Sequence, residues 1–253
     1  MTPPGNPYDD PAFVARYARA RPRPPDDLLT LLIELCRRDP PRLVVDLGCG
    51  TGLSTALWKG KARKVVGIEE NPFMLRRARR VPGVEYRLAS ASDTGLESGS
   101  ADIVTCSQSF HWMRPRRAIP EIARILRRGG VFAAYDYALP PLIDPGVDPA
   151  FTSLLRWCGL PVLPVEKAEH LPNLARSRRF RWVREFTVHH AELGNARRVT
   201  DLALSVAHVA ARLPEGDRSQ NPHFRALRRA AESAFGQRRR RFWWTYRVEL
   251  AVK

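Results

Sequence analysis

Short apolar runs that end in polar or acidic residues alternate with amphipathic segments through the first half of the chain. The runs at 43–47, 64–69 and 100–107 have the length and the Val and Ile content of buried strands. This alternation predicts βαβ units, and therefore a parallel sheet with right-handed crossovers. In such a sheet the ligand crevice lies at the carboxyl ends of the strands.

Segments outside this alternation have a periodicity of their own. Residues 26–36 predict a helix, because two acids begin the segment and two basic residues follow it, which suits the helix dipole. Residues 181–190 alternate as a strand does, and 199–213 have the pattern of an amphipathic helix. Residues 243–252 predict a closing strand, which we expect to be antiparallel.

A Pro-rich stretch at 139–146 interrupts the pattern, and we assign the residues after it to a substrate cap. Apolar residues there could line a pocket, although their spacing is more often that of ordinary core; they are Phe151, Leu154, Leu155, Trp157, Leu160 and Leu163. The 253 residues have room for one α/β domain with such a cap. We expect an N-terminal arm and lid helices at 1–40, a cofactor-binding core at 41–138, the substrate-cap insertion at 139–180, and a strand-helix-strand at 181–253 that completes the sheet.

The most informative motif is an apolar strand that ends in Asp46 and is followed by Gly48, Gly50 and Gly52. Glycines permit positive φ angles and remove every Cβ that would keep a ligand off the backbone. A helix beginning within Leu53–Leu57 would add free N–H groups, so the geometry suits a nucleoside-bearing cofactor. The third glycine comes one residue earlier than G-x-G-x-x-G requires and no Lys follows, which argues against a dinucleotide or a Walker-type phosphate site.

A second acid ends the next apolar run. Glu69 closes the segment 64–69, about twenty residues after the first acid, where a doubly wound fold presents a carboxylate to the cofactor ribose. We therefore expect Glu69 to accept the ribose hydroxyls.

The glycine motif resembles the first motif of class I S-adenosyl-L-methionine (SAM)-dependent methyltransferases, and the resemblance extends through five elements in order. The matching segments are Val44–Gly52, Val66–Glu69, Tyr86–Asp93, Ser100–Ser107 and Glu121–Phe132. The resemblance implies an α/β fold with a Rossmann-like, seven-stranded, mostly parallel sheet, an antiparallel C-terminal strand, helices on both faces and a helical cap. It also implies SAM as the cofactor and S-adenosyl-L-homocysteine as its product.

The resemblance implies cofactor contacts at several strand ends. The glycines would admit the methionine and ribose portions, Asp46 would orient their loop, and Glu69 would accept the ribose hydroxyls. Ser90, Ala91 and Ser92 would frame the adenine, although a loop cap is an equally good interpretation of Ser92. The other expected contacts are Thr51, Glu70 and Ser107.

Two further features resemble the trans-aconitate methyltransferase-like branch of small-molecule enzymes. They are Phe13, Tyr17, Arg21, Pro22 and Pro25 near the start of the chain, and Gln108–Trp112 after the fourth strand. In that branch the early Tyr and Arg form a lid, so the resemblance implies cofactor contacts for Tyr17 and Arg21; a surface role is the alternative for Arg21. The branch also implies a small-molecule acceptor, which could be a carboxylate, a hydroxyl or an amine.

Methyl transfer by in-line displacement asks the protein mainly for positioning and water exclusion. An acceptor with a proton to lose would also gain from a general base, and His111, just past the fourth strand, is the candidate. The alternative interpretation is that His111 only walls the cofactor pocket.

The charge is the one feature that opposes a small-molecule substrate. The chain has 42 Lys and Arg residues against 26 Asp and Glu, a net charge of +16, which attracts polyanions. The basic residues are dispersed, which favours solvated helix faces; the run Arg238–Arg241, followed by Phe242-Trp243-Trp244, is the best candidate for a nucleic-acid patch. An RNA or DNA methyltransferase is therefore the second hypothesis, and a SAM-binding protein without catalysis is the third.

The cysteine spacing and the hydropathy of the chain indicate its cellular compartment and argue against metal and membrane partners. Cys36, Cys49, Cys106 and Cys158 are widely separated and lack metal-ligand spacing, so we expect reduced thiols and no metal. Residues 1–5 lack the order of a secretion signal, and no apolar run approaches the length of a membrane span. We expect a cytoplasmic protein without membrane contacts, and the sequence does not determine its oligomeric state.

Overall fold

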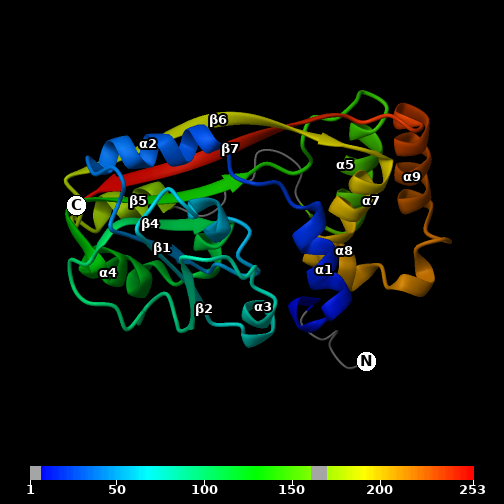
Figure 1. The fold of residues 1–253 in the computed structure, drawn as a ribbon. Helices are drawn as coiled ribbons and strands as arrows, with labels where there is room; N and C mark the ends of the chain where they lie inside the picture. The colour runs from blue at the N-terminus through cyan, green and yellow to red at the C-terminus, as the bar shows by residue number, and fades with distance from the viewer. Residues whose placement is uncertain (1–6, 161–169) are drawn as a thin grey trace. The chain divides into compact units, whose positions relative to one another are not determined.

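Seven strands form one sheet in the computed structural model, which describes residues 7–160 and 170–253 (Figure 1). The strands are β1 (Leu43–Leu47), β2 (Lys64–Glu69), β3 (Val84–Leu88), β4 (Ala101–Ser107), β5 (Leu126–Tyr137), β6 (Trp182–Gly194) and β7 (Arg240–Val252). Their order is β3-β2-β1-β4-β5-β7-β6. Strands β1 to β5 pair in parallel, and β7 pairs antiparallel with β5. The predicted mostly parallel sheet with an antiparallel C-terminal strand is confirmed.

The chain divides into two compact units. The sheet unit consists of Arg23–Tyr137, Glu166–Val188 and Tyr246–Lys253, and the helical unit consists of Met1–Pro22, Ala138–Val165 and His189–Thr245. Strands β6 and β7 each contribute residues to both units. The expected segments 1–40, 139–180 and 181–253 are likewise divided between the two.

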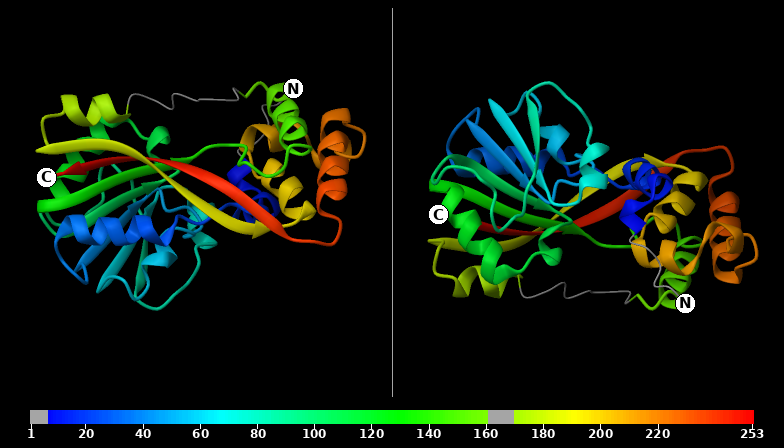
Figure 2. Two further views of the ribbon diagram at one scale, coloured as in Figure 1. Left: turned by 90° about the horizontal axis from the view of Figure 1, so that it is seen from above. Right: turned by 90° about the horizontal axis from the view of Figure 1, so that it is seen from below.

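Helices cover both faces of the sheet within the sheet unit (Figures 1 and 2). On one face lies α2 (Asp26–Cys36), the helix that the sequence predicts, with Leu28, Leu29 and Leu32 fully buried. On the other face α4 (Pro115–Ile125) and α6 (His170–Arg176) pack over apolar side chains of β1, β2, β4 and β5. The short elements of this unit are η2 (Thr55–Trp58), α3 (Pro72–Arg76) and η3 (Phe110–Trp112).

A buried carboxylate fixes the end of the sheet opposite the glycine loop. Asp102, at the start of β4, is fully buried and accepts hydrogen bonds from the backbone N–H groups of Arg42 and Leu43 and from the side chains of Arg38 and Arg127. Burial opposes ionisation, but these bonds outweigh it and lower the pKa of the Asp102 carboxyl. Asp102 therefore holds β1, β4, β5 and the end of α2 together.

The helical unit contains α1 (Pro11–Ala20), α5 (Asp148–Trp157), α7 (Ala196–Leu204), α8 (Ala207–Arg212) and α9 (Pro222–Phe235), with the short turns η1 (Pro7–Asp9) and η4 (Glu215–Asp217). Within it, α7 packs against both α1 and α9, and α5 packs against α9. Phe151, Leu154 and Leu155 of α5 are fully buried, which agrees with ordinary core. Leu163, predicted with them, lies outside the described residues, as do residues 1–6 of the expected N-terminal arm.

Two predicted elements differ from the structure. The single helix expected at 199–213 is wrong, because α7 ends at Leu204 and α8 begins at Ala207. The Ser205 hydroxyl bonds back to the Leu202 carbonyl at 2.6 Å, and the Ser205 carbonyl accepts from the Arg21 guanidinium at 2.7 Å, so the chain leaves the helical ladder there. The segment Glu121–Phe132, by its resemblance, is expected to hold a helix, a turn and the fifth strand. The turn instead lies inside β5, as a register irregularity with Gly129 at φ 75°.

Within the described residues, no helix has both the length and the apolar character that crossing a membrane requires.

Candidate functional site

The glycine loop follows β1 and has the left-handed backbone that its sequence predicts. Gly48, Gly50 and Gly52 have φ angles of 67°, 55° and 73°, values that side-chain-bearing residues adopt only with strain. A Cβ on Gly48 would lie 2.6 Å from the Cβ of Ser109, and one on Gly52 would meet the Tyr86 ring, with its Cζ at 2.9 Å. The loop therefore cannot accept a side chain at either position; Gly48 and Gly50 are half-buried, and Gly52 is buried.

The expected helix with free N–H groups after this loop is wrong. Only the short 3-10 turn η2 forms, because Gly60 at φ 75° turns the chain toward β2 four residues later. The loop N–H groups are also used internally: those of Gly48 and Cys49 donate to the Ile68 carbonyl, and that of Gly52 donates to the Cys49 carbonyl. The loop can therefore accommodate a ligand by close backbone approach rather than by a helix dipole.

Asp46 holds the glycine loop in place through buried hydrogen bonds. It is fully buried at the end of β1, and its carboxylate accepts hydrogen bonds from Ser54 and Thr55 at 2.6 Å each and from Thr105 at 2.9 Å. Burial raises the pKa of Asp46, and the three hydroxyl donors oppose that rise. These bonds connect β1 to η2 and β4, so Asp46 orients the loop from the inside.

Glu69, at the end of β2, accepts a hydrogen bond from the backbone of the glycine loop. One carboxylate oxygen accepts from the Gly50 N–H at 2.9 Å, and the other accepts from the Asn71 N–H at 2.8 Å. Burial is the main reason that its pKa is raised. Each oxygen keeps a lone pair for a further donor, as a ribose diol would require. Glu70, the next residue, is exposed.

Thr51 supplies a polar atom that the described residues do not satisfy. Its side chain is buried, and its Oγ1 makes no hydrogen bond within the described residues. A buried hydroxyl normally has a partner. Together with the bare glycine backbone and the Glu69 carboxylate, it makes a site whose chemistry fits a nucleoside-bearing ligand.

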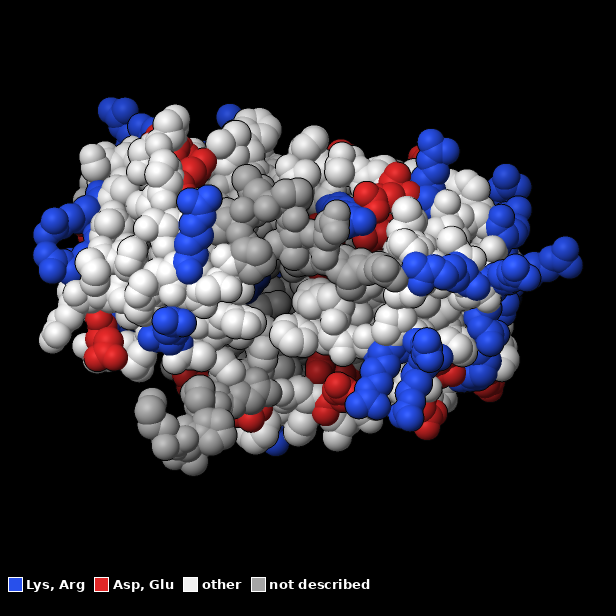
Figure 3. All heavy atoms as spheres, turned by 180° about the vertical axis from the view of Figure 1, so that it is seen from behind, with Lys and Arg blue, Asp and Glu red and all other residues white. Residues whose placement is uncertain are grey.

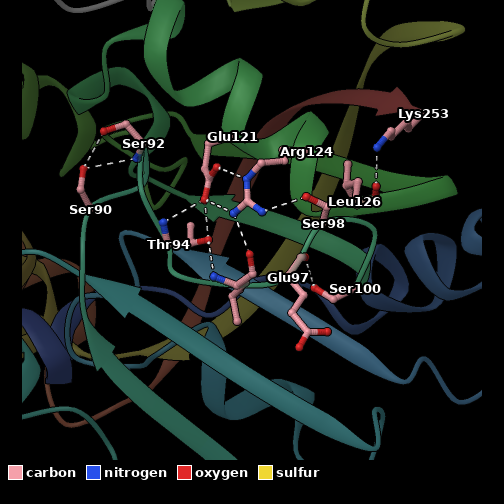
Figure 4. Close-up of polar contacts among 11 residues, drawn as sticks. Ser90, Ser92, Thr94, Glu97, Ser98, Ser100, Glu121, Arg124, Leu126 and Lys253 are labelled. Atoms are coloured by element: carbon pink, nitrogen blue, oxygen red, sulfur yellow. Dashed lines mark hydrogen bonds and ion pairs between the residues drawn. The ribbon is translucent and has the colours of Figure 1, made fainter.

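The turn after β3 is held by a buried acid on α4 (Figure 4). The Ser90 and Ser92 hydroxyls lie 3.0 Å apart within this turn, and half-buried Ala91 lies between them. Farther along the loop, Glu121 accepts from the Thr94 N–H at 2.9 Å and from its hydroxyl at 2.6 Å. Arg124 binds Glu121 and also the Leu96 carbonyl and the Ser98 hydroxyl, so α4 fixes the segment that follows the predicted adenine-binding residues.

The polar residues after β4 lie on the same sheet edge. Ser107 is half-buried at the end of β4, and the Ser109 hydroxyl donates to the Leu47 carbonyl at 2.7 Å, which joins this loop to the glycine loop. His111 is half-buried, and its Nδ1 lies 3.5 Å from Oδ1 of Asp136 on β5. Trp112, beside it, is 66% exposed.

Tyr17 and Arg21, the expected lid residues, belong to the helical unit. Tyr17 is half-buried in α1, and the Arg21 guanidinium lies over its ring at 4.8 Å. Arg21 also donates to the Ser205 carbonyl. Their proposed role toward a cofactor bound in the sheet unit stays a prediction.

All four cysteines are free and buried. Burial raises the pKa of the Cys49 and Cys106 thiols, so they are poor nucleophiles. No group of three or more acids, histidines and cysteines in the described ranges has an arrangement suited to a metal ion.

Sequence reasoning missed several residues that shape this edge. Tyr86 packs against both Gly52 and Gly67, and a glycine inside the predicted strand 64–69 was a signal of close approach by a bulky neighbour. Asp136 and Glu249 are acids among the mainly apolar residues 131–137 and 242–252, a pattern that could have marked them as candidates.

Comparison with known proteins identifies the domain that carries this loop. Residues 45–134 match the methyltransferase domain family. They form a class I, SAM-dependent methyltransferase domain. The match covers the glycine loop, Glu69, the turn after β3 and His111, and the predicted family resemblance is confirmed.

The methyltransferase domain has relatives in several organisms. An uncharacterized methyltransferase of Mycobacterium tuberculosis is 40% identical over 119 residues, which are 46% of this chain and 47% of that protein. A trans-aconitate 2-methyltransferase of Methylobacterium radiotolerans is 33% identical over 128 residues, 49% of this chain and 47% of the relative. The chain thus spans about half the length of the curated relatives it matches.

One solved structure resembles nearly the whole chain. It is described as a type II methyltransferase from Anaeromyxobacter dehalogenans, and it is 26% identical with a TM-score of 0.69 over 92% of this chain and 97% of its own.

Proposed function

We propose that the protein transfers a methyl group from SAM to a small-molecule acceptor by in-line displacement. The observation that carries the proposal is the cradle at the carboxyl ends of β1 and β2. There, glycine backbone that cannot accept a Cβ lies beside the Glu69 carboxylate and the Thr51 hydroxyl, which has no hydrogen-bond partner among residues 7–160 and 170–253. These features fit a ligand that brings a ribose diol and approaches the backbone closely.

Within this proposal each residue has a definite task. Glu69 accepts the ribose hydroxyls, Asp46 keeps the loop in shape, and the turn at Ser90–Ser92 frames the adenine. When bound, the cofactor supplies a sulfonium methyl group that is already a strong electrophile. The protein contributes alignment of the acceptor, exclusion of water and, through His111, a base for an acceptor that must lose a proton.

A small-molecule acceptor is supported by the relative named as a trans-aconitate 2-methyltransferase. The distribution of surface charge also supports it: Figure 3 shows Lys and Arg side chains spread over the visible face, with acidic side chains among them. The four residues Arg238–Arg241 are exposed, but Phe242 and Trp244 are buried in β7, and Arg240 is paired with Asp144 at 2.8 Å. Of the aromatic residues proposed for base stacking, this leaves Trp243 exposed.

Calorimetry tests the proposal directly. We expect micromolar binding of SAM and S-adenosyl-L-homocysteine, and no binding of NAD, by protein freed of co-purified nucleic acid. Gly52→Ala should abolish binding, because its Cβ meets the Tyr86 ring. Gly60→Ala is the matched control: its φ is also positive, at 75°, but a Cβ there meets no atom within 4 Å.

The outcomes separate the hypotheses. Absence of SAM binding by the wild type would overturn the proposal. If the protein bound SAM and methylated RNA or DNA but no small acid, phenol or amine, the acceptor would be a nucleic acid instead of a small molecule. Binding with no methylated product of any kind would leave a SAM-binding protein without catalysis.

A further inference from the structure

Charged side chains form a row next to His111 on the α4 side of the sheet. Asp136 on β5 pairs in register with Arg247 on β7, and Arg247 reaches Glu185 on β6 at 2.7 Å. Two residues farther along β7, Glu249 lies 3.3 Å from the Arg247 guanidinium. All five residues belong to the sheet unit, so the row is defined within one unit of the chain.

Burial distinguishes the members of this row. Asp136 and Glu249 are buried, whereas Glu185 and Arg247 are about one-third exposed. The His111 Nδ1 atom is also buried and makes no hydrogen bond within the described residues, and it lies 3.5 Å from Asp136 Oδ1. Because catalytic hydrogen bonds are often long before substrate binds, this spacing suits a pair that tightens in the complex.

The charges in the row are unequal. Three carboxyl groups, on Asp136, Glu185 and Glu249, face one guanidinium, on Arg247. Glu249 reflects the excess: burial, reinforced by Asp136 and Glu185 and opposed by Arg247, raises its pKa to about 7. Such surroundings oppose a further anion beside the row.

We propose that Asp136 is a positioning residue that holds His111 as the general base, and that the acceptor therefore presents an O–H or N–H group rather than a carboxylate. The inference rests on the proposed methyltransferase function and narrows its acceptor. A carboxylate has no proton to lose near neutral pH, and its charge would meet the acid excess of the row. An alcohol, phenol or amine avoids both objections.

The step balances as a displacement with proton transfer. The acceptor oxygen or nitrogen forms a bond to the methyl carbon while the carbon–sulfur bond breaks, and the electron pair of that bond stays on sulfur. The acceptor proton passes to Nε2 of His111. The imidazolium that results keeps its Nδ1–H toward the Asp136 carboxylate, which stabilises the new charge.

A double-mutant cycle tests the coupling. With a phenol or amine acceptor, His111→Ala and Asp136→Asn should each lower kcat by about 10²-fold or more, with KM for SAM unchanged. The double variant should be no slower than His111→Ala alone, because residues that act as one unit are not additive. Asp39→Asn, the same change at an exposed aspartate, is the control and should keep wild-type kcat.

A second measurement needs no acceptor. At about pH 8.5, where a free imidazole is uncharged, diethyl pyrocarbonate should modify His111 several-fold more slowly in Asp136→Asn than in the wild type. Peptide mass spectrometry reads the rate, with exposed His208 as the internal control. The slower rate is expected because Asp136 increases the nucleophilicity of Nε2 by accepting the Nδ1 proton.

The results distinguish the two levels of proposal. Methylation of carboxylates alone, or full kcat in Asp136→Asn, would overturn the inference while leaving the methyltransferase in place. An unchanged modification rate of His111 in Asp136→Asn would overturn it even if no acceptor were found. Failure to bind SAM would instead remove the proposed function itself.

Discussion

Glu249 offers the sharpest test of the energetics of the sheet unit. Its side chain is 2% exposed, and its pKa is raised to about 7 from a usual 4.5, chiefly by burial. Between these two pH values, the folded protein holds a proton that the unfolded chain has lost. The free energy of unfolding therefore falls as pH rises from about 4.5 to about 7, and it falls no further through this group at higher pH.

The size of the effect follows from the shift. A difference of about 2.5 pKa units corresponds to about 3 kcal/mol. Glu249→Gln has nearly the shape of the protonated acid, and Arg247 keeps its bond to Glu185 in the variant. We expect Glu249→Gln to match the wild type near pH 4.5 and to be more stable by about 3 kcal/mol above pH 8.

Urea denaturation followed by circular dichroism measures both proteins across this pH range, and the informative quantity is the difference between their unfolding free energies. A difference that stays constant with pH would show that Glu249 does not titrate in the window. A variant that becomes less stable than the wild type as pH rises would show that the Arg247 ion pair outweighs burial. Either result would refute the reasoning.

Three further predictions concern other described contacts. Glu121→Gln should show the opposite pH dependence to Glu249→Gln. In the wild type, hydrogen bonds from Arg124 lower the pKa of Glu121 to about 2; burial opposes this change, and hydrogen bonds from Thr94 add to it. The wild type should be about 3 kcal/mol more stable near neutral pH, with the difference shrinking as pH falls below about 4.5, as read by the same denaturation series. Calorimetry should also find weaker SAM binding by Glu121→Gln, because the loop after Ser92 loses its anchor; unchanged affinity would mean that the loop does not depend on α4. Asp102→Asn should lower the unfolding free energy by about 3 to 5 kcal/mol at neutral pH, since two arginines lose a buried carboxylate; a loss below about 1 kcal/mol in urea denaturation would contradict this role.

Much of the sheet could be predicted because its signals are local. The strands β1, β2 and β4 are mostly apolar runs, and each has a polar residue at or next to its carboxyl end. The positions of Asp46 and Glu69 follow from this pattern alone, since parallel neighbours bring their ends to one edge. The break at Ser205 was not predictable, because it depends on a bond from Arg21, which is distant in sequence.

The row of charged residues beside His111 depends on strand register, which a sequence pattern does not determine. Asp136 meets Arg247 through the register of β5 against β7, and a shift of one residue would place Arg247 on the other face of the sheet. Tyr86 similarly reaches Gly52 because β3 lies beside β2. Strand composition predicts that such residues lie in the sheet, but only the pairing determines which of them meet.

The strand order β5-β7-β6 has a consequence for synthesis on the ribosome. β6 leaves the ribosome before β7, yet its neighbour in the sheet is β7 rather than β5. A nascent chain that has not reached residue 240 therefore has no strand for β6 to pair with, and the edge of β5 stays open. The growing chain then has two unpaired strand edges at once, and this is the interval in which a chaperone would have the most to protect.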